Sequence, residues 1–288
     1  MSARLVHRYG DHPSQVGELF LPAGTPVGVT VVLHGGFWRA AYDRHLMDDL
    51  CADLAAAGWV AWNLEYRRTA GADGGWPATL LDVAAGIDHL ATLDIPEGQA
   101  LGHGRIGQDR VEHSAGQPAE SHGATERDMS GGLSLTPLVA IGHSAGGHLA
   151  LWAAARGRLP AGAPGAAPRV QITHAVSQAG VVDLLEAARL GLGRGAAQGL
   201  VGAQPDSDSE RWRLASPAAL LPLGVPQLLV HGAHDDIVPA ALSEAYARRA
   251  VELGDDARAV ILPGMGHFAH LDPSSAAWQA VRDWLNLP

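Results

Sequence analysis

The sequence predicts an α/β protein with a mostly parallel central sheet and helices on both faces. Short, Val-rich apolar runs alternate along the chain with segments of helical periodicity, which is the pattern of repeated βαβ units. Several of these runs contain almost no polar residue, as expected for strands that are covered on both faces. A Gly-rich turn, Gly142-His143-Ser144-Ala145-Gly146, connects one run to a helical segment.

The first half of the chain supplies two such units. Residues 16–21 are predicted to form a strand that ends at Pro22, and residues 27–33 form a Val-rich strand inside the sheet. Residues 42–57 are predicted to be helical because Leu46, Leu50 and Leu54 recur every four positions. Gly58 ends this helix, and a strand at 59–63 and a helix at 77–93 follow.

The second half continues the alternation after a break. Residues 98–133 are Gly-rich and polar, with no apolar periodicity, and are predicted to be a flexible insert in a single domain that spans 1–288. A small lid is predicted at 183–222, where a short helix at 183–190 leads into a Gly-rich, acidic stretch. The remaining predicted strands are 138–141, 170–176, 226–230 and 257–262, and the remaining helices are 148–156, 241–253 and 275–285.

Composition excludes several functional classes. The net charge of −10 argues against a nucleic-acid or anionic-membrane surface. All basic residues are Arg, so no Lys is available for a Schiff base or a P-loop. Cys51 is the single cysteine, which excludes an intrachain disulfide and a Cys-based zinc site. We expect no metal and no other cofactor.

The absence of a signal-peptide pattern and of a long apolar run predicts a cytoplasmic protein without a membrane segment. The expected partner is a small-molecule substrate. The oligomeric state stays open, with a homodimer as one option.

Ser144 is the candidate nucleophile. It occupies the centre of a G-x-S-x-G turn between a strand and a helix, which is the context in which this motif exposes a serine hydroxyl. Gly142 and Gly146 are needed because side chains there would collide as strand and helix close together.

A serine hydroxyl needs a base, and the base works best when a carboxylate fixes its tautomer. Asp235 and His267 each follow a predicted strand, so both are expected at the edge where parallel strands end. Asp236 competes with Asp235, which is favoured by its position between His231-Gly232 and Val238-Pro239. His270 and His231 compete with His267, which is favoured by its Gly-rich turn.

His34-Gly35-Gly36-Phe37 follows the Val-rich strand and is the candidate oxyanion-binding loop. Backbone N–H donors are expected from Gly36, Phe37 and Ala145, whereas His34 is expected to order the loop. Trp38 and Trp212 are candidate substrate-binding residues. For Trp212, ordinary packing is an equally good interpretation.

These residues resemble the α/β-hydrolase superfamily over residues 16–287. Within it, His34-Gly35-Gly36-Phe37-Trp38 is similar to the HGG[FYW]W group of arylformamidase (kynurenine formamidase)-like enzymes and small esterases. Glu65-Tyr66-Arg67 and His267-Phe268 are also similar to that group. The resemblance implies an α/β-hydrolase fold, a Ser–Asp–His triad and no cofactor.

The function expected from the sequence is therefore hydrolysis of a small carboxylic ester through an acyl-serine intermediate. The alternative is an arylformamidase-type reaction on N-formyl-kynurenine or a similar amide, because the same groups cleave activated amides. A third interpretation is a non-catalytic binding protein with this fold, since fold alone does not decide function.

Overall fold

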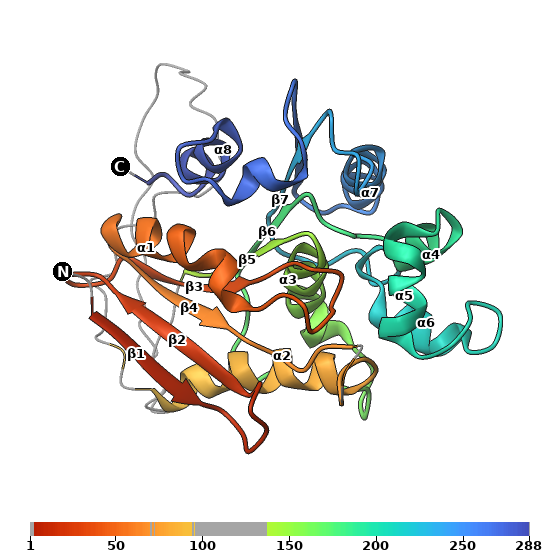
Figure 1. Ribbon diagram of the computed structural model, residues 1–288, viewed down its shortest axis with the longest axis horizontal. Coiled ribbons are helices and arrows are strands. Elements are labelled where there is room, and N and C mark those ends of the chain that lie inside the picture. Colours follow the sequence, from red (N-terminus) through yellow and green to blue (C-terminus); the bar gives the residue numbers. More distant parts are fainter. Residues whose placement is uncertain (1–2, 70, 72, 94, 96–136, 288) are drawn as a thin grey trace, which may run out of the picture.

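Eight strands form one sheet in the computed structural model, which describes residues 3–69, 71, 73–93, 95 and 137–287 (Figure 1). The order across the sheet is β1-β2-β4-β3-β5-β6-β7-β8. β1 and β2 pair antiparallel with each other, and β2 pairs antiparallel with β4. All further pairings are parallel. The bounds are β1 Ala3–Arg8, β2 Val16–Leu21, β3 Gly28–Leu33, β4 Trp59–Leu64, β5 Leu138–His143, β6 His174–Gln178, β7 Gln227–Gly232 and β8 Ala257–Leu262.

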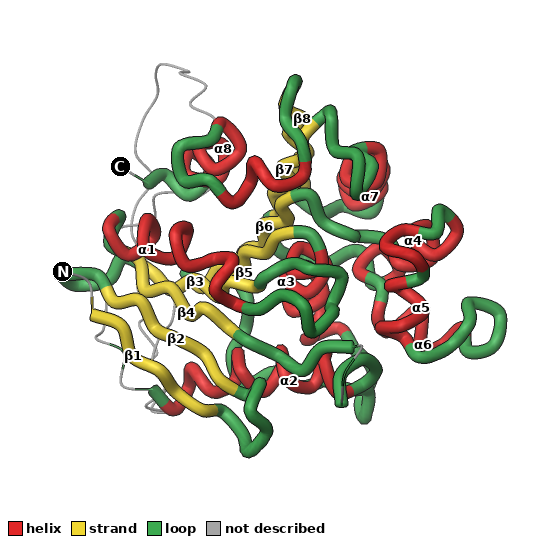
Figure 2. Tube along the Cα trace, in the orientation of Figure 1, coloured by secondary structure: helices red, strands yellow, loops and turns green. Residues whose placement is uncertain are grey.

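Helices cover both faces of this sheet (Figure 2). α1 and α8 pack on one face, and α2, α3 and α7 pack on the other, with α4, α5 and α6 beyond α3. The α-helices are α1 Asp48–Ala56, α2 Ala78–Asp88, α3 Ala145–Ala155, α4 Leu184–Arg189, α5 Ala196–Val201, α6 Ser209–Ala215, α7 Ala241–Glu252 and α8 Ala276–Trp284. Short 3-10 helices include η1 Arg44–Met47 and η6 His267–Leu271. No helix of the described residues has the length and apolar character to cross a bilayer.

The apolar runs of the sequence fill two cores. In β3, Val31 packs into the core that contains α2 and α3, whereas the neighbouring Val32 packs into the core that contains α1 and α8. In β5, Ala140 packs into the core with α2 and α3, and Ile141 packs into the core with α1 and α8. Because successive side chains of a strand point to opposite faces, a strand that is covered on both sides needs a continuous apolar run. The predicted mostly parallel sheet with helices on both faces is confirmed.

The structure differs from the predicted elements in several places. β1 was not predicted, because Ala3–Arg8 shows no regular alternation of polar and apolar residues and forms an exposed outer strand. β6 begins at His174 and not at residue 170, since Val170 and Ile172 precede it in irregular backbone. The helix predicted over 77–93 ends as an α-helix at Asp88 and continues as a 3-10 helix, His89–Thr92.

The segment predicted as a lid, 183–222, contains α4, α5 and α6, of which only α4 was predicted as a helix. Asp183 accepts hydrogen bonds from the N–H groups of Leu185 and Glu186, which explains where α4 begins. The segment contacts the loop that follows β3, because the Arg39 guanidinium donates to the Gly193 carbonyl. Whether it moves as a lid stays a prediction. The insert predicted at 98–133 lies outside the described residues.

Candidate active site

Ser144 lies at the junction of β5 and α3, as the motif predicts. Its φ is 56° and its ψ is −117°, a conformation that non-glycine residues rarely adopt. Its N–H donates to the Gln178 carbonyl at 2.8 Å, which ties the turn to the end of β6. Strain of this kind persists only where the surrounding structure imposes it, and it often accompanies function.

The glycines around Ser144 are required by packing. A Cβ on Gly142 would lie 2.0 Å from the Gly146 carbonyl oxygen. A Cβ on Gly146 would lie 2.0 Å from the Leu33 carbonyl oxygen, so α3 rests directly on the end of β3. The close approach brings the serine turn and the loop after β3 together.

Asp235 and His267 are in direct contact. The His267 Nδ1–H donates to Asp235 Oδ2 at 2.7 Å, and both side chains are almost fully buried. This bond fixes the tautomer of His267 and leaves Nε2 as the unprotonated nitrogen. Of the competing carboxylates, Asp236 is exposed. The predicted contact between an acid after β7 and a histidine after β8 is therefore made by Asp235 and His267.

The environment of Asp235 favours the ionised carboxylate. Burial would raise its pKa, but hydrogen bonds from His231 and His267 and from the Val238 N–H hold the pKa well below its usual range. Oδ1 accepts the N–H groups of Ile237 and Val238, both at 2.9 Å. The acid is thus charged and held in place by its own loop.

His143 links the serine turn to the His267 loop. Its Nε2–H donates to the His267 carbonyl at 2.9 Å, and the two rings lie 4.8 Å apart between centroids. Burial, with the adjacent His267 as the next contribution, lowers the pKa of His143 to about 3, so the ring stays neutral. No hydrogen bond joins the Ser144 hydroxyl to the His267 ring within the described residues. The structure therefore brings their loops together without closing that last contact.

The loop after β3 packs against the serine turn. A Cβ on Gly35 would lie 3.1 Å from Ser144 Cβ. Gly36, Phe37 and Trp38 then follow with positive φ values of 106°, 51° and 56°, which turn the backbone sharply. In the part of the chain that is described, the N–H groups of Gly36, Phe37 and Ala145 find no protein acceptor. These are the three donors predicted for the oxyanion.

Two residues that the sequence did not assign to the site hold this loop. Glu65 Oε1 lies 3.0 Å from His34 Nε2, and the Tyr66 hydroxyl donates to the His34 carbonyl at 2.8 Å. The rings of His34 and Tyr66 stack with centroids 4.3 Å apart. Burial would raise the pKa of Glu65, but the contact with His34 lowers it overall. The expectation that His34 orders the loop agrees with these contacts.

Trp38 and Trp212, the two candidate substrate-binding residues, are both buried in the core beside α3. The Trp38 ring meets His148 edge to face, with centroids 5.1 Å apart. Neither indole N–H has a partner among the described residues. Their predicted contact with substrate stays a prediction. Phe268 follows His267 in η6; its side chain is exposed, and its ring meets the His267 ring edge to face with centroids 5.3 Å apart.

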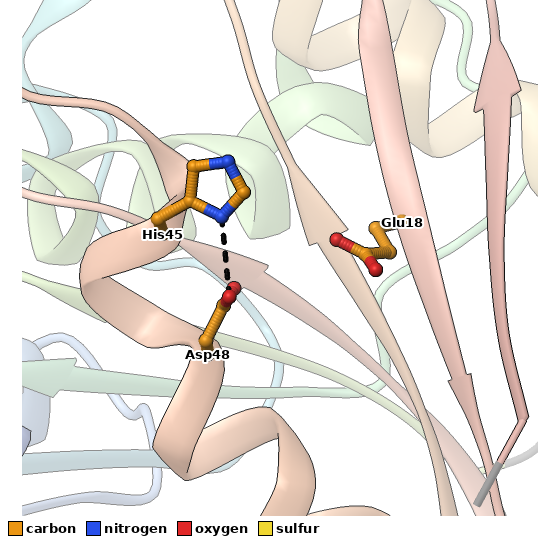
Figure 3. Close-up of side chains that lie close together, drawn as sticks. All are labelled: Glu18, His45 and Asp48. Atoms are coloured by element: carbon orange, nitrogen blue, oxygen red, sulfur yellow. Dashed lines mark hydrogen bonds and ion pairs between the residues drawn. The ribbon is translucent and has the colours of Figure 1, made fainter.

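One group of side chains has the composition of a metal site. Glu18, His45 and Asp48 each offer a ligand atom, and these atoms lie within 4.8 Å of one another (Figure 3). Arg4 lies 3.6 Å from Asp48 and Arg44 lies 3.9 Å from Glu18, so each carboxylate already has a cationic neighbour. The group fits a network of ion pairs better than a cation site.

Comparisons with known proteins agree with this architecture. The BD-FAE family model matches residues 132–249, which is less than half of the chain. A search of curated proteins finds no match. A truncated carbohydrate esterase from gut microbiota is similar in structure, with a TM-score of 0.74 and 19% identity over 99% of this chain and 95% of that chain.

Two bacterial esterases are also similar in structure. Esterase B from Lactobacillus rhamnosis, in a form inhibited by a tributyrin phosphonate, has a TM-score of 0.71 and 17% identity over 98% of this chain and 84% of its own. Esterase 2 from the planctomycete Thermogutta terrifontis, with bound butyrate, has a TM-score of 0.65 and 19% identity over 98% of this chain and 90% of its own. At such identities the likeness concerns the fold, and the chain has the α/β-hydrolase fold.

Proposed function

We propose that the protein is a serine hydrolase that cleaves a small carboxylic ester. The observation that carries this proposal is the buried Asp235–His267 contact beside the strained turn of Ser144. The BD-FAE match and the similarity to three esterases support an ester as the substrate class.

In the proposed reaction, Ser144 Oγ attacks the ester carbonyl carbon while His267 Nε2 takes the hydroxyl proton. The N–H groups of Gly36, Phe37 and Ala145 stabilise the negative oxygen of the tetrahedral intermediate. The C–O bond to the alcohol then breaks, and His267 returns the proton to the leaving oxygen. Water, activated in turn by His267, attacks the acyl-Ser144 carbonyl and releases the acid.

Asp235 keeps its charge throughout this cycle. Its low pKa means that it accepts the Nδ1–H of His267 and stabilises the imidazolium without taking the proton. His143 and His34 hold the two loops on either side of Ser144 and take no part in proton transfer.

A formamide is the second candidate substrate. The motif His34-Gly35-Gly36-Phe37-Trp38 is similar to that of arylformamidase-like enzymes, and the same groups would attack an activated amide. This alternative has support from the motif alone.

A side-by-side rate assay tests both candidates. p-Nitrophenyl acetate and butyrate, acetylated oligosaccharides and N-formyl-kynurenine are compared at equal concentration, with Ser144→Ala as the control. We expect ester cleavage that is lost in the control, together with labelling of Ser144 by a fluorophosphonate. Faster deformylation than ester cleavage would favour the formamide reaction. No turnover and no labelling would leave the non-catalytic interpretation.

A further inference from the structure

His231 contacts the same carboxylate oxygen as His267. Its Nε2 lies 3.1 Å from Asp235 Oδ2, the atom that accepts the His267 Nδ1–H at 2.7 Å. The His231 side chain is fully buried near the end of β7. Two imidazoles from different elements therefore converge on one oxygen of the proposed catalytic acid.

The remaining contacts of His231 fix its tautomer. Nε2 also lies 2.9 Å from the Val238 carbonyl, which can only accept, so Nε2 carries a proton. Nδ1 lies 2.8 Å from the Ser243 hydroxyl, which can donate to it. The Nε2–H of His231 is thus shared between Asp235 and Val238, and Ser243 of α7 contacts Nδ1 on the other side of the ring.

We propose that His231 is a positioning residue of the proposed esterase. Its Nε2–H holds Asp235 toward His267 and stabilises part of the negative charge on the carboxylate. The proposal rests on the proposed function and adds to the triad a chain of contacts, Ser243 to His231 to Asp235. His231 touches neither the substrate nor the reacting atoms in this scheme.

The other titratable groups near Asp235 leave this effect isolated. They are His267 and His270 on η6, His143 at the end of β5, and the exposed His234 and Asp236 on either side of Asp235 in its own loop. Burial lowers the pKa of both His143 and His270 to about 3, so neither ring changes charge near neutral pH. α7 contributes the uncharged Ser243 to this cluster.

Removal of His231 has a defined electrostatic consequence. The charge on Asp235 Oδ2 would then act on His267 alone, and His267 would hold its proton to higher pH. The acid limb of the kcat/KM profile reports the protonation of the essential base in the free enzyme. Without His231, the acid limb should therefore move to higher pH. KM should not change, because His231 does not contact the substrate in this scheme.

The experiment compares wild type, His231→Leu, His231→Gln and Ser243→Ala on p-nitrophenyl acetate from about pH 5 to about pH 9. For His231→Leu we expect the midpoint of the acid limb to move to higher pH by roughly half a pH unit to one pH unit. Its plateau kcat should fall roughly tenfold, because Asp235 is less well held. His231→Gln, which keeps an N–H donor, should recover most of both effects, and Ser243→Ala should give a smaller shift in the same direction.

A fall in kcat without any movement of the acid limb, in all three folded variants, would overturn the proposal and leave His231 a packing residue. If His231→Leu does not fold, Ser243→Ala decides the outcome: an acid limb at higher pH supports the proposal, and an unmoved acid limb overturns it.

A second readout does not depend on turnover. The far-downfield proton NMR signal of the His267 Nδ1–H should shift in His231→Leu and in Ser243→Ala, and much less in His231→Gln, if His231 stabilises the negative charge of Asp235. An unchanged signal in both His231→Leu and Ser243→Ala would contradict the proposal. If wild-type protein neither cleaves esters nor reacts with fluorophosphonate, but the NMR signal still shifts in the variants, the proposed function is contradicted and the role of His231 in holding Asp235 stands.

Discussion

Among the histidine–aspartate contacts of the described residues, the buried contact of His267 with Asp235 and the more exposed contact of His45 with Asp48 have very different surroundings. His267 and Asp235 are 2.7 Å apart, with side chains 4% and 0% exposed. His45 and Asp48 are 3.1 Å apart, with side chains 56% and 23% exposed. The geometry of the contacts is similar, so the difference lies in what surrounds each pair.

Asp235 has only N–H donors around it, from two imidazoles and its own backbone, and no arginine pairs with it among the described residues. Asp48 faces Arg4, and the nearby Glu18 faces Arg44. An arginine that is always charged neutralises a carboxylate permanently, whereas an imidazole can gain and lose a proton beside it. Four substitutions test this contrast, from the largest expected effect to the smallest.

Ser144→Ala should reduce kcat by about 10⁵-fold or more, because loss of the nucleophile removes the covalent route. The exposed pair has no nucleophile beside it, so no variant of His45 should approach this loss. Turnover of p-nitrophenyl butyrate checks the effect, with thermal unfolding as the control for the fold. Residual activity within tenfold of wild type would remove Ser144 from the mechanism.

Asp235→Asn should lower kcat by about 10⁴-fold, since an amide supports the wrong tautomer of His267. The matched variant Asp48→Asn should leave kcat within about twofold, because an exposed ion pair contributes little. Asp236→Asn serves as the neighbouring control. Comparable losses in Asp48→Asn and Asp235→Asn would break the distinction between the two pairs.

Glu65→Gln should lower kcat roughly tenfold with little change in KM. The substitution keeps the shape of the side chain but weakens its contact with His34, so the loop that carries Gly36 and Phe37 is less well held. The rate of acyl-enzyme formation, followed in stopped flow, is the measurement. A change in KM alone would indicate that the loop binds substrate and does not stabilise the oxyanion.

Buried histidines should make folding stability depend on pH. Burial lowers the pKa of His143, His148 and His270 to about 3, 4 and 3, whereas an unfolded histidine titrates near 6.5. As the pH falls, these histidines are therefore protonated in the unfolded chain before they are protonated in the folded protein. The stability is fully present above about pH 6.5 and is lost as the pH falls toward about 3.

His148→Leu should flatten this loss of stability, and the exposed His45→Ala should leave it unchanged. The free energy of unfolding in urea, measured between about pH 5 and about pH 8, checks the slope. An unchanged slope in His148→Leu would mean that His148 is already protonated or accessible in the folded state.

The parallel strands and the order Ser144, Asp235, His267 could be predicted from the sequence because they depend on local signals. Continuous apolar runs mark strands that are buried on both faces, and Gly-rich turns at their ends mark where side chains can meet. The choice of Asp235 over Asp236 also followed from the spacing of its loop, and the contact with His267 agrees with it.

The supporting contacts could not be predicted, because they join residues that are far apart in sequence. Nothing local indicates that Glu65 faces His34 or that Ser243 faces His231. β1 was missed for a related reason: an outer strand that is exposed on both faces has a weak apolar pattern, and pairing with β2 determines it. The helices α5 and α6 are short, and their Gly-rich and acidic sequences have low helix propensity.

The sheet order has a consequence for how activity arises during folding. β5 lies beside β3 although more than a hundred positions separate them, and the loops after β7 and β8 complete the site. Such non-local pairing is slow, since long stretches of chain must be closed before the contacts form. If Ser144, Asp235 and His267 act together as proposed, a nascent chain is inactive until at least His267 has emerged from the ribosome, and Ser144 meets His267 only after the far edge of the sheet has assembled.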